Sequence, residues 1–266
     1  MEMVASARMR RTEQRAVEAR PYAKRLSDLM SQVVSQFAVP QEHAFLSRRE
    51  EEPVLVLHFT TDKGLCGGLN TRLNHSLVDF LSSRQSQSRV VTVGRKGREF
   101  ALRSRMDLLG EFSGIGDAPG IADLRPLCVL ATDMFARGES NRVYLSYPRF
   151  QSVMIQRPVI EQLLPAEAPE ALGVRFRDFV YEPDIDRVLD ALIVRYVEAS
   201  VYHAYLECVA SEYSARMVAM HNATDSAREL VEDMTMQLNK SRQAAITEEI
   251  CDVAAGTEAM TGGWRG

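Results

Sequence analysis

Apolar residues recur in alternating steps of three and four at both ends of the chain, which is the spacing of a coiled-coil helix. Near the N-terminus this seam runs from Ala5 to Phe37, and Thr12 is its one polar position. Pro21 lies within it, so we expect a bend or a short break in the preceding turn. Pro40 should end the helix, because proline cannot continue the hydrogen-bond ladder.

The C-terminal pattern is longer. No glycine or proline occurs between Pro183 and Gly256, and a second seam runs from Leu189 to Leu238 with only His203 and Thr224 polar. A single helix of that length would span on the order of 100 Å, whereas an ordinary helix has about 11 residues. Such a helix needs a partner for its seam, and the N-terminal helix is the obvious one.

Between the helices, from about residue 52 to 182, strand-like runs alternate with helical patterns, which is typical of an α/β domain with a partly parallel sheet. The last two strand candidates abut through "YPRFQ", so we expect them to form an antiparallel hairpin. The predicted organisation is an N-terminal helix at 1–39, an α/β domain at 52–182 and a long C-terminal helix at 184–256. The predicted strands are "PVLVLHFT", "RVVTVG", "DLLGEFSG", "NRVYLSYPRF" and "SVMIQRPVIEQLL", and the predicted helices lie at 71–83 and 121–136.

A glycine-rich loop, "TDKGLCGGLN", follows the first predicted strand and resembles a phosphate-binding loop in composition. It matches neither the Walker A pattern nor the dinucleotide pattern, because the Lys and Ser/Thr positions and the GxGxxG spacing are missing. We therefore favour a structural strand-to-helix turn over a phosphate site. Asn70 is placed to cap the helix that follows. "GRKGREF", which begins at Gly94, is interpreted as a solvated basic turn.

Composition narrows the function classes further. The net charge of −4 does not imply a dominant surface for nucleic acid or for an anionic membrane. No run is long enough to span a bilayer, so direct membrane insertion is not expected. The four cysteines and five histidines are scattered, so the sequence predicts no metal site, no cofactor and no catalytic group. Cys128 and Cys208 are expected to be small apolar core residues.

Several segments resemble one family, in the right order along nearly the whole chain. They are "MEMVASARMRR", "RPYA", "DKGLCGGLN", "ASEYSARMVAMHNATDSA" and "NKSRQAAITEEI", and together they look like the gamma subunit of F-type ATP synthases. The resemblance implies two terminal helices wound into an antiparallel coiled coil with an inserted Rossmann-like α/β domain. It implies a non-catalytic central rotor shaft that couples a membrane ion-translocating c-ring to a catalytic ring of alpha and beta subunits. The epsilon subunit is a further implied partner, and the implied location is peripheral, on the cytoplasmic face of the bacterial inner membrane.

The resemblance also implies roles for individual residues. One group matches family positions that contact the catalytic ring, and a second group matches the foot that meets the c-ring and epsilon. Phe179 stands where the family can have tyrosine, which puts a hydroxyl contact there in doubt. The first group is Met1, Glu212, Arg216, Arg242, Gln243 and Thr247, and the second is Tyr22, Phe179 and Glu182.

Two alternatives stay open from the sequence. An α/β phosphate-binding protein would bind nucleotide in a titration, and a free-standing coiled-coil scaffold would not co-purify with alpha and beta subunits. Family members usually begin about twenty residues earlier, and in a helix these residues would add on the order of 30 Å, at ~1.5 Å per residue. An upstream helical segment is therefore expected to cover part of the C-terminal seam.

Overall fold

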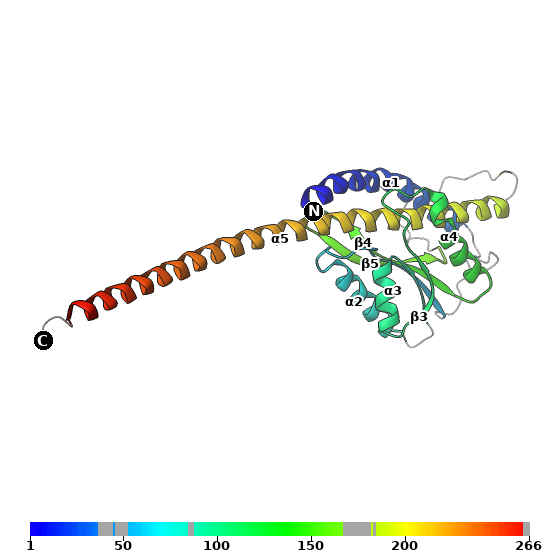
Figure 1. Cartoon of the computed structure of the whole chain (residues 1–266). Helices are drawn as coiled ribbons and strands as arrows, with labels where there is room; N and C mark the ends of the chain where they lie inside the picture. The colour runs from blue at the N-terminus through cyan, green and yellow to red at the C-terminus, as the bar shows by residue number, and fades with distance from the viewer. Residues whose placement is uncertain (37–44, 46–52, 85–87, 167–181, 183–184, 263–266) are drawn as a thin grey trace. The chain divides into compact units, whose positions relative to one another are not determined.

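A computed structural model describes residues 1–36, 45, 53–84, 88–166, 182 and 185–262 (Figure 1). The chain divides into two compact units, Met1–Ala219 and Met220–Gly266. The first unit holds the α/β domain, the N-terminal helix and the beginning of the C-terminal helix. The second holds the rest of the C-terminal helix.

The α/β domain is built on one five-stranded sheet with the order β3-β2-β1-β4-β5. The first four strands in this order are parallel, and β5 is antiparallel to β4, as the sequence predicts. All six residues of β1 are buried, because the central strand is covered on both faces. The strands are β1 (Val54–Phe59), β2 (Ser88–Val93), β3 (Asp107–Phe112), β4 (Arg142–Phe150) and β5 (Gln156–Leu164).

Alternate residues of β1 face two different cores. Leu55, Leu57 and Phe59 pack in the larger core with α4 (Ile121–Ala136) and the C-terminal helix α5 (Ile185–Gly262). On the other face Val54 and Val56 pack with Leu77 of α2 (Leu69–Ser82). The sheet therefore carries α2 on one side, and α4 with α5 on the other.

The basic segment after Gly94 is a helix, α3 (Arg95–Arg103), so the interpretation as a solvated turn is wrong. Gly97 and Ala101 form its buried face, while its charged side chains lie on the outer face. Because the packed residues are so small, the segment lacks the large apolar periodicity that identifies a helix in a sequence.

Helix α1 (Glu2–Gln36) lies along the first part of α5 in Figure 1. The two helices are antiparallel, since Arg8 contacts Tyr213 whereas Arg20 contacts Glu207. The helix continues through Pro21 and is curved, not broken. The expected α/β fold with an antiparallel coiled coil is therefore confirmed. The buried positions of the predicted N-terminal seam are Ala5, Met9, Thr12, Ala16, Leu26, Met30 and Val33.

The second unit is the remainder of α5, and its apolar side chains are exposed in the single chain. None of the helices in the described ranges is both long enough and apolar enough to cross a membrane. Cys128 and Cys208 are buried in the larger core, as the sequence predicts. The exposed apolar residues of the second unit are Leu230, Val231, Met234, Met236, Leu238, Ile246, Ile250 and Val253.

Candidate functional site: the sheet edge covered by the C-terminal helix

The carboxyl ends of the parallel strands are where open α/β sheets usually bind their ligands. In this protein α5 lies across that edge. Tyr205 donates a hydrogen bond of 2.7 Å to the carbonyl of Gly116, in the loop after β3. The Ser211 hydroxyl donates one of 3.0 Å to the carbonyl of Pro148 in β4. The helix of the coiled coil thus occupies the position that a ligand takes in related architectures.

The glycine loop joins β1 to α2 in a compact turn. Leu65 and Gly67 both have positive φ, at 63° and 57°. The Thr61 hydroxyl donates to the carbonyl of Lys63 at 2.7 Å and closes the turn from inside. Leu65 is nevertheless 67% exposed, so the turn presents a large apolar side chain to solvent.

Asn70 does not cap α2, and the expected capping role is wrong. The residue before the helix is Gly68, which has no side-chain cap, and Asn70 lies within the first turn. Its side-chain amide donates to the Thr61 hydroxyl at 2.8 Å and to the Cys66 sulfur at 3.3 Å. Asn70 therefore holds the loop closed from the helix side.

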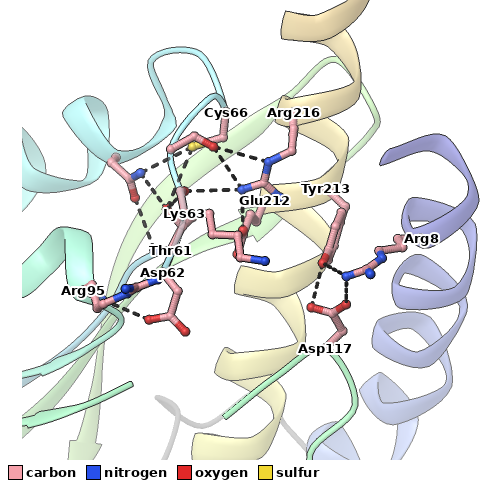
Figure 2. Close-up of polar contacts among 12 residues, drawn as sticks. Arg8, Thr61, Asp62, Lys63, Cys66, Arg95, Asp117, Glu212, Tyr213 and Arg216 are labelled. Carbon is pink, nitrogen blue, oxygen red and sulfur yellow. Dashed lines mark hydrogen bonds and ion pairs between the residues drawn. The ribbon is translucent and has the colours of Figure 1, made fainter. Parts of the chain in front are cut away.

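Arg216 of α5 fastens this loop to the coiled coil (Figure 2). Its guanidinium donates to the Gly64 carbonyl at 3.2 Å and to the Lys63 carbonyl at 3.3 Å. Glu212 accepts a hydrogen bond of 2.5 Å from the same Arg216 group. A phosphate cradle presents backbone N–H groups to its ligand, whereas this loop presents carbonyl oxygens to a cation. The geometry supports the interpretation of the loop as a structural turn.

A cavity of about 250 Å³ remains beside this contact, between α5 and the ends of β1, β2 and β3. Asp62 on its wall accepts hydrogen bonds from the backbone N–H groups of Arg95 and Gly114. It therefore secures the beginning of α3 and the loop after β3 together. Burial in the cavity wall raises the pKa of Glu212, and the positive charge of Arg216 partly offsets this rise.

A second contact joins α1, α5 and the loop after β3 (Figure 2). The Tyr213 hydroxyl donates to Asp117 at 2.7 Å, and Arg8 donates to the other oxygen of Asp117 at 2.8 Å. Burial and the hydrogen bond to Asp117 raise the pKa of Tyr213. The side chains of Arg8 and Asp117 are 52% and 40% exposed, so solvent weakens this ion pair.

Of the residues predicted to contact partners, Glu212 and Arg216 are joined by their side chains. Their side chains are 14% and 13% exposed and face the glycine loop. Arg242, Gln243 and Thr247 are exposed in the second unit, where the Thr247 hydroxyl donates to the Gln243 carbonyl at 2.8 Å. Met1, Tyr22 and Glu182 are exposed, and Phe179 lies outside the described residues.

Sequence reasoning missed the residues that join the elements. Arg8, Asp117 and Tyr213 are distant in the sequence, as are Arg20 and Glu207. The available signal was weak: a charged residue, Glu207, stands within an otherwise apolar stretch of the C-terminal helix. Within the described ranges, no group of three His, Cys, Asp or Glu side chains is arranged to hold a metal ion.

Replacing Arg216 with methionine should destabilise the isolated chain by about 2–3 kcal/mol, because two loop carbonyls and the buried Glu212 carboxylate would lose their donor. Urea unfolding followed by circular dichroism measures the loss. Arg98→Met is the matched control, since Arg98 pairs with Glu111 on the exposed side of α3. Equal stability of the two variants would show that Arg216 does not hold the loop.

Comparison with known proteins places these features in a family. The pattern of the ATP synthase family matches residues 1–260. The ATP synthase gamma chain of Dehalococcoides mccartyi strain 195 is 39% identical over 264 residues, which cover 98% of this chain and 92% of the relative. That of Acidithiobacillus ferrooxidans strain ATCC 53993 is 41% identical over 267 residues, with the same coverage.

Two solved structures share the fold. One comes from the central stalk and c-ring of the Tetrahymena thermophila mitochondrial ATP synthase, with a TM-score of 0.64 and 23% identity, covering 84% of this chain and 97% of that one. Another comes from the Euglena gracilis mitochondrial ATP synthase, with a TM-score of 0.62 and 17% identity. The match covers 98% of this chain and 97% of that one.

Proposed function

The chain belongs to the gamma-chain family of ATP synthase, and from this premise we propose how it works as the central-stalk rotor subunit. Its α/β domain is the foot that meets the membrane c-ring, and α5 carries rotation towards the catalytic ring of alpha and beta subunits. The chain itself supplies no catalytic group. It changes the conformational preference of the catalytic sites by presenting different faces to them as it turns.

One observation supports this mechanism: α5 covers the edge of the sheet where open α/β sheets usually bind a ligand. Arg216 holds the glycine loop, and Tyr205 and Ser211 hold the neighbouring strand ends. The α/β domain is thereby joined to the coiled coil at several points. A rotor needs such joints, because torque applied to the foot must reach the helix.

The proposed ring contacts are Met1 and the exposed residues Arg242, Gln243 and Thr247. Glu212 and Arg216 are mostly buried, so we propose that they act on the ring through the loop that they hold, with Leu65 as the exposed contact.

The foot contacts are proposed to include Tyr22, Phe179 and Glu182, with the epsilon subunit as a further partner. The proposed location is peripheral, at the cytoplasmic face of a bacterial inner membrane.

Reconstitution tests the rotor role. The chain is combined with alpha and beta subunits, a bead is fixed to the α/β domain, and ATP is added. We expect unidirectional rotation of the bead and no ATP hydrolysis by the chain alone. Turnover by the purified chain, or an assembled ring without rotation, would contradict the proposal.

Truncating Arg242 and Gln243 to alanine should reduce ATP-driven rotation or coupled transport while leaving the helicity of the chain nearly unchanged. Both side chains are exposed, and alanine favours a helix. Circular dichroism measures helicity, and bead rotation measures function. The control is Arg228→Ala, which removes a charge from another exposed position of the same unit. Equal rotation by the double variant and by the native chain would refute the assignment.

A further inference from the structure

Glu207 of α5 is a fully buried carboxylate at a point where three elements meet. Its side chain is 1% exposed. One oxygen accepts a hydrogen bond of 2.7 Å from Arg20 Nε in α1, and the other accepts bonds from Arg20 Nη2 and from the backbone N–H of Phe150. Phe150 is the last residue of β4. A single carboxylate therefore binds the coiled coil and the sheet at once.

Arg20 completes the arrangement from the other side. Its Nη2 donates to the Phe150 carbonyl at 2.6 Å, so both backbone groups of Phe150 are bound. We call Arg20, Phe150 and Glu207 the three-element junction. His203 lies 3.9 Å from Glu207, and burial lowers the pKa of this histidine.

Small apolar side chains surround the three-element junction. Ala16 and Ala210 pack there with Leu206 and Phe150, so the two helices meet through small side chains. The hydrophobic effect is non-directional, and it opposes separation of such surfaces more than sliding. A bidentate, charge-assisted pair has a defined geometry and opposes sliding as well.

We propose that Glu207 is a positioning residue that fixes the angle of the α/β domain on the coiled coil and thereby sets the torsional stiffness of the rotor. This inference rests on the proposed rotor function. The Glu207 carboxylate is buried, whereas the Arg20 side chain is 40% exposed. Removing a carboxylate from water offsets much of the attraction to its partner, so the pair contributes little net stability, whereas its geometry is specific. The three-element junction therefore serves mainly to resist twisting under load.

The test uses the chain assembled with alpha and beta subunits. The ring is immobilised and arrested, a bead is attached to a cysteine introduced at the exposed Met154, and Cys251 is changed to serine in every version. The variance of the bead angle reports torsional stiffness. In the double variant Arg20→Met with Glu207→Leu, we expect the variance to rise roughly twofold or more, because the directional pair is gone.

Two further variants make the result decisive. Arg149→Met with Glu161→Leu removes an ion pair that joins β4 to β5 within the sheet, and it should leave the variance unchanged. Arg20→Lys keeps the positive charge but loses the bidentate geometry, so it should raise the variance even if the double variant does not assemble.

The thermal midpoint reports stability separately from stiffness. It should fall further in Arg20→Met with Glu207→Leu, because the backbone N–H of Phe150 loses its buried acceptor, whereas the Arg149–Glu161 pair is half-exposed. Arg20→Lys keeps that acceptor, so a raised variance in this variant reports stiffness and not the loss of the acceptor. An unchanged variance in Arg20→Lys and in any assembled double variant would overturn the inference. A native chain that does not rotate in the ring would overturn the rotor role itself, and the two failures are therefore distinguishable.

Discussion

Replacing Gly94 with alanine should lower the free energy of unfolding of the α/β domain by roughly 2–5 kcal/mol. Two costs add up in this loss: the strain of a left-handed backbone conformation and the clash of the added methyl group with its neighbours. Gly94 has a φ of 102°, a backbone angle that residues with a side chain rarely adopt. A Cβ atom at this position would lie 2.3 Å from the Thr60 carbonyl oxygen and 2.7 Å from its carbon. Backbone atoms cannot rotate away, so β1 and the beginning of α3 would have to separate.

The close approach at Gly94 supports several hydrogen bonds that would be lost with it. The Thr60 hydroxyl accepts a bond of 2.8 Å from the N–H of Gly97 and donates to the Val93 carbonyl. Thermal and urea unfolding of Gly94→Ala measure the effect. Gly110→Ala is the control, because nothing lies within 4 Å of its Cβ position and its φ is ordinary. Similar midpoints for both variants would contradict the prediction.

Acidification should destabilise the same domain through His58. This residue of β1 is fully buried, and burial lowers its pKa from 6.5 to about 4. Nε2 lies 3.1 Å from Asn74 Oδ1, which can only accept, so the neutral ring carries its proton on Nε2. Nδ1 then accepts from the Ser146 hydroxyl at 2.9 Å. Charging this ring inside the sheet is unfavourable.

The pH window follows from the two pKa values. Between pH 6.5 and 4 the unfolded chain binds a proton at His58 that the folded chain does not, so stability falls as the pH falls. The loss should reach about 2 kcal/mol at pH 5 and about 3 kcal/mol near pH 4. Well above pH 6.5 this contribution is constant, because the ring is neutral in both states.

The difference between the native chain and His58→Gln isolates this effect. Both proteins retain His203, whose pKa is also lowered by burial, and both retain every carboxylate. Urea unfolding at pH 7.5, 6, 5 and 4 should show a shallower pH dependence in His58→Gln. Parallel stability curves would show that His58 is charged in the folded state or that it is not buried.

The strands could be predicted from the sequence because burial dictates their composition directly. The run "VLVLHF" is buried at every position in β1, so an apolar stretch of this length between turn residues was sufficient evidence. Helix α3 could not be predicted in the same way. Its contact with the sheet is made by Gly97 and Ala101, and close packing of a glycine leaves no apolar signal.

The glycine loop shows a different limit. Its turn conformation follows from glycine and from the missing phosphate motif, both of which are local features. Its partner is Arg216, which lies more than 150 positions away and resembles any exposed arginine in the sequence. The capping expectation for Asn70 failed because α2 begins one residue earlier, at Leu69, so Asn70 lies in the first turn. Its side chain binds Thr61 and Cys66 of the loop instead.

Covering the sheet edge with the last helix also imposes an order on biosynthesis. The seam of α1 is made first, but Met9, Met30 and Val33 are buried with residues of α5 such as Leu189 and Val197, which leave the ribosome only after the whole sheet. At ~5–20 residues per second, the first helix waits on the order of 10 s or more for its partner. During that interval the nascent chain exposes an apolar stripe and an unfinished sheet edge. We therefore expect chaperones to bind the chain before its C-terminal helix is complete, and release to coincide with synthesis of the segment around Arg216.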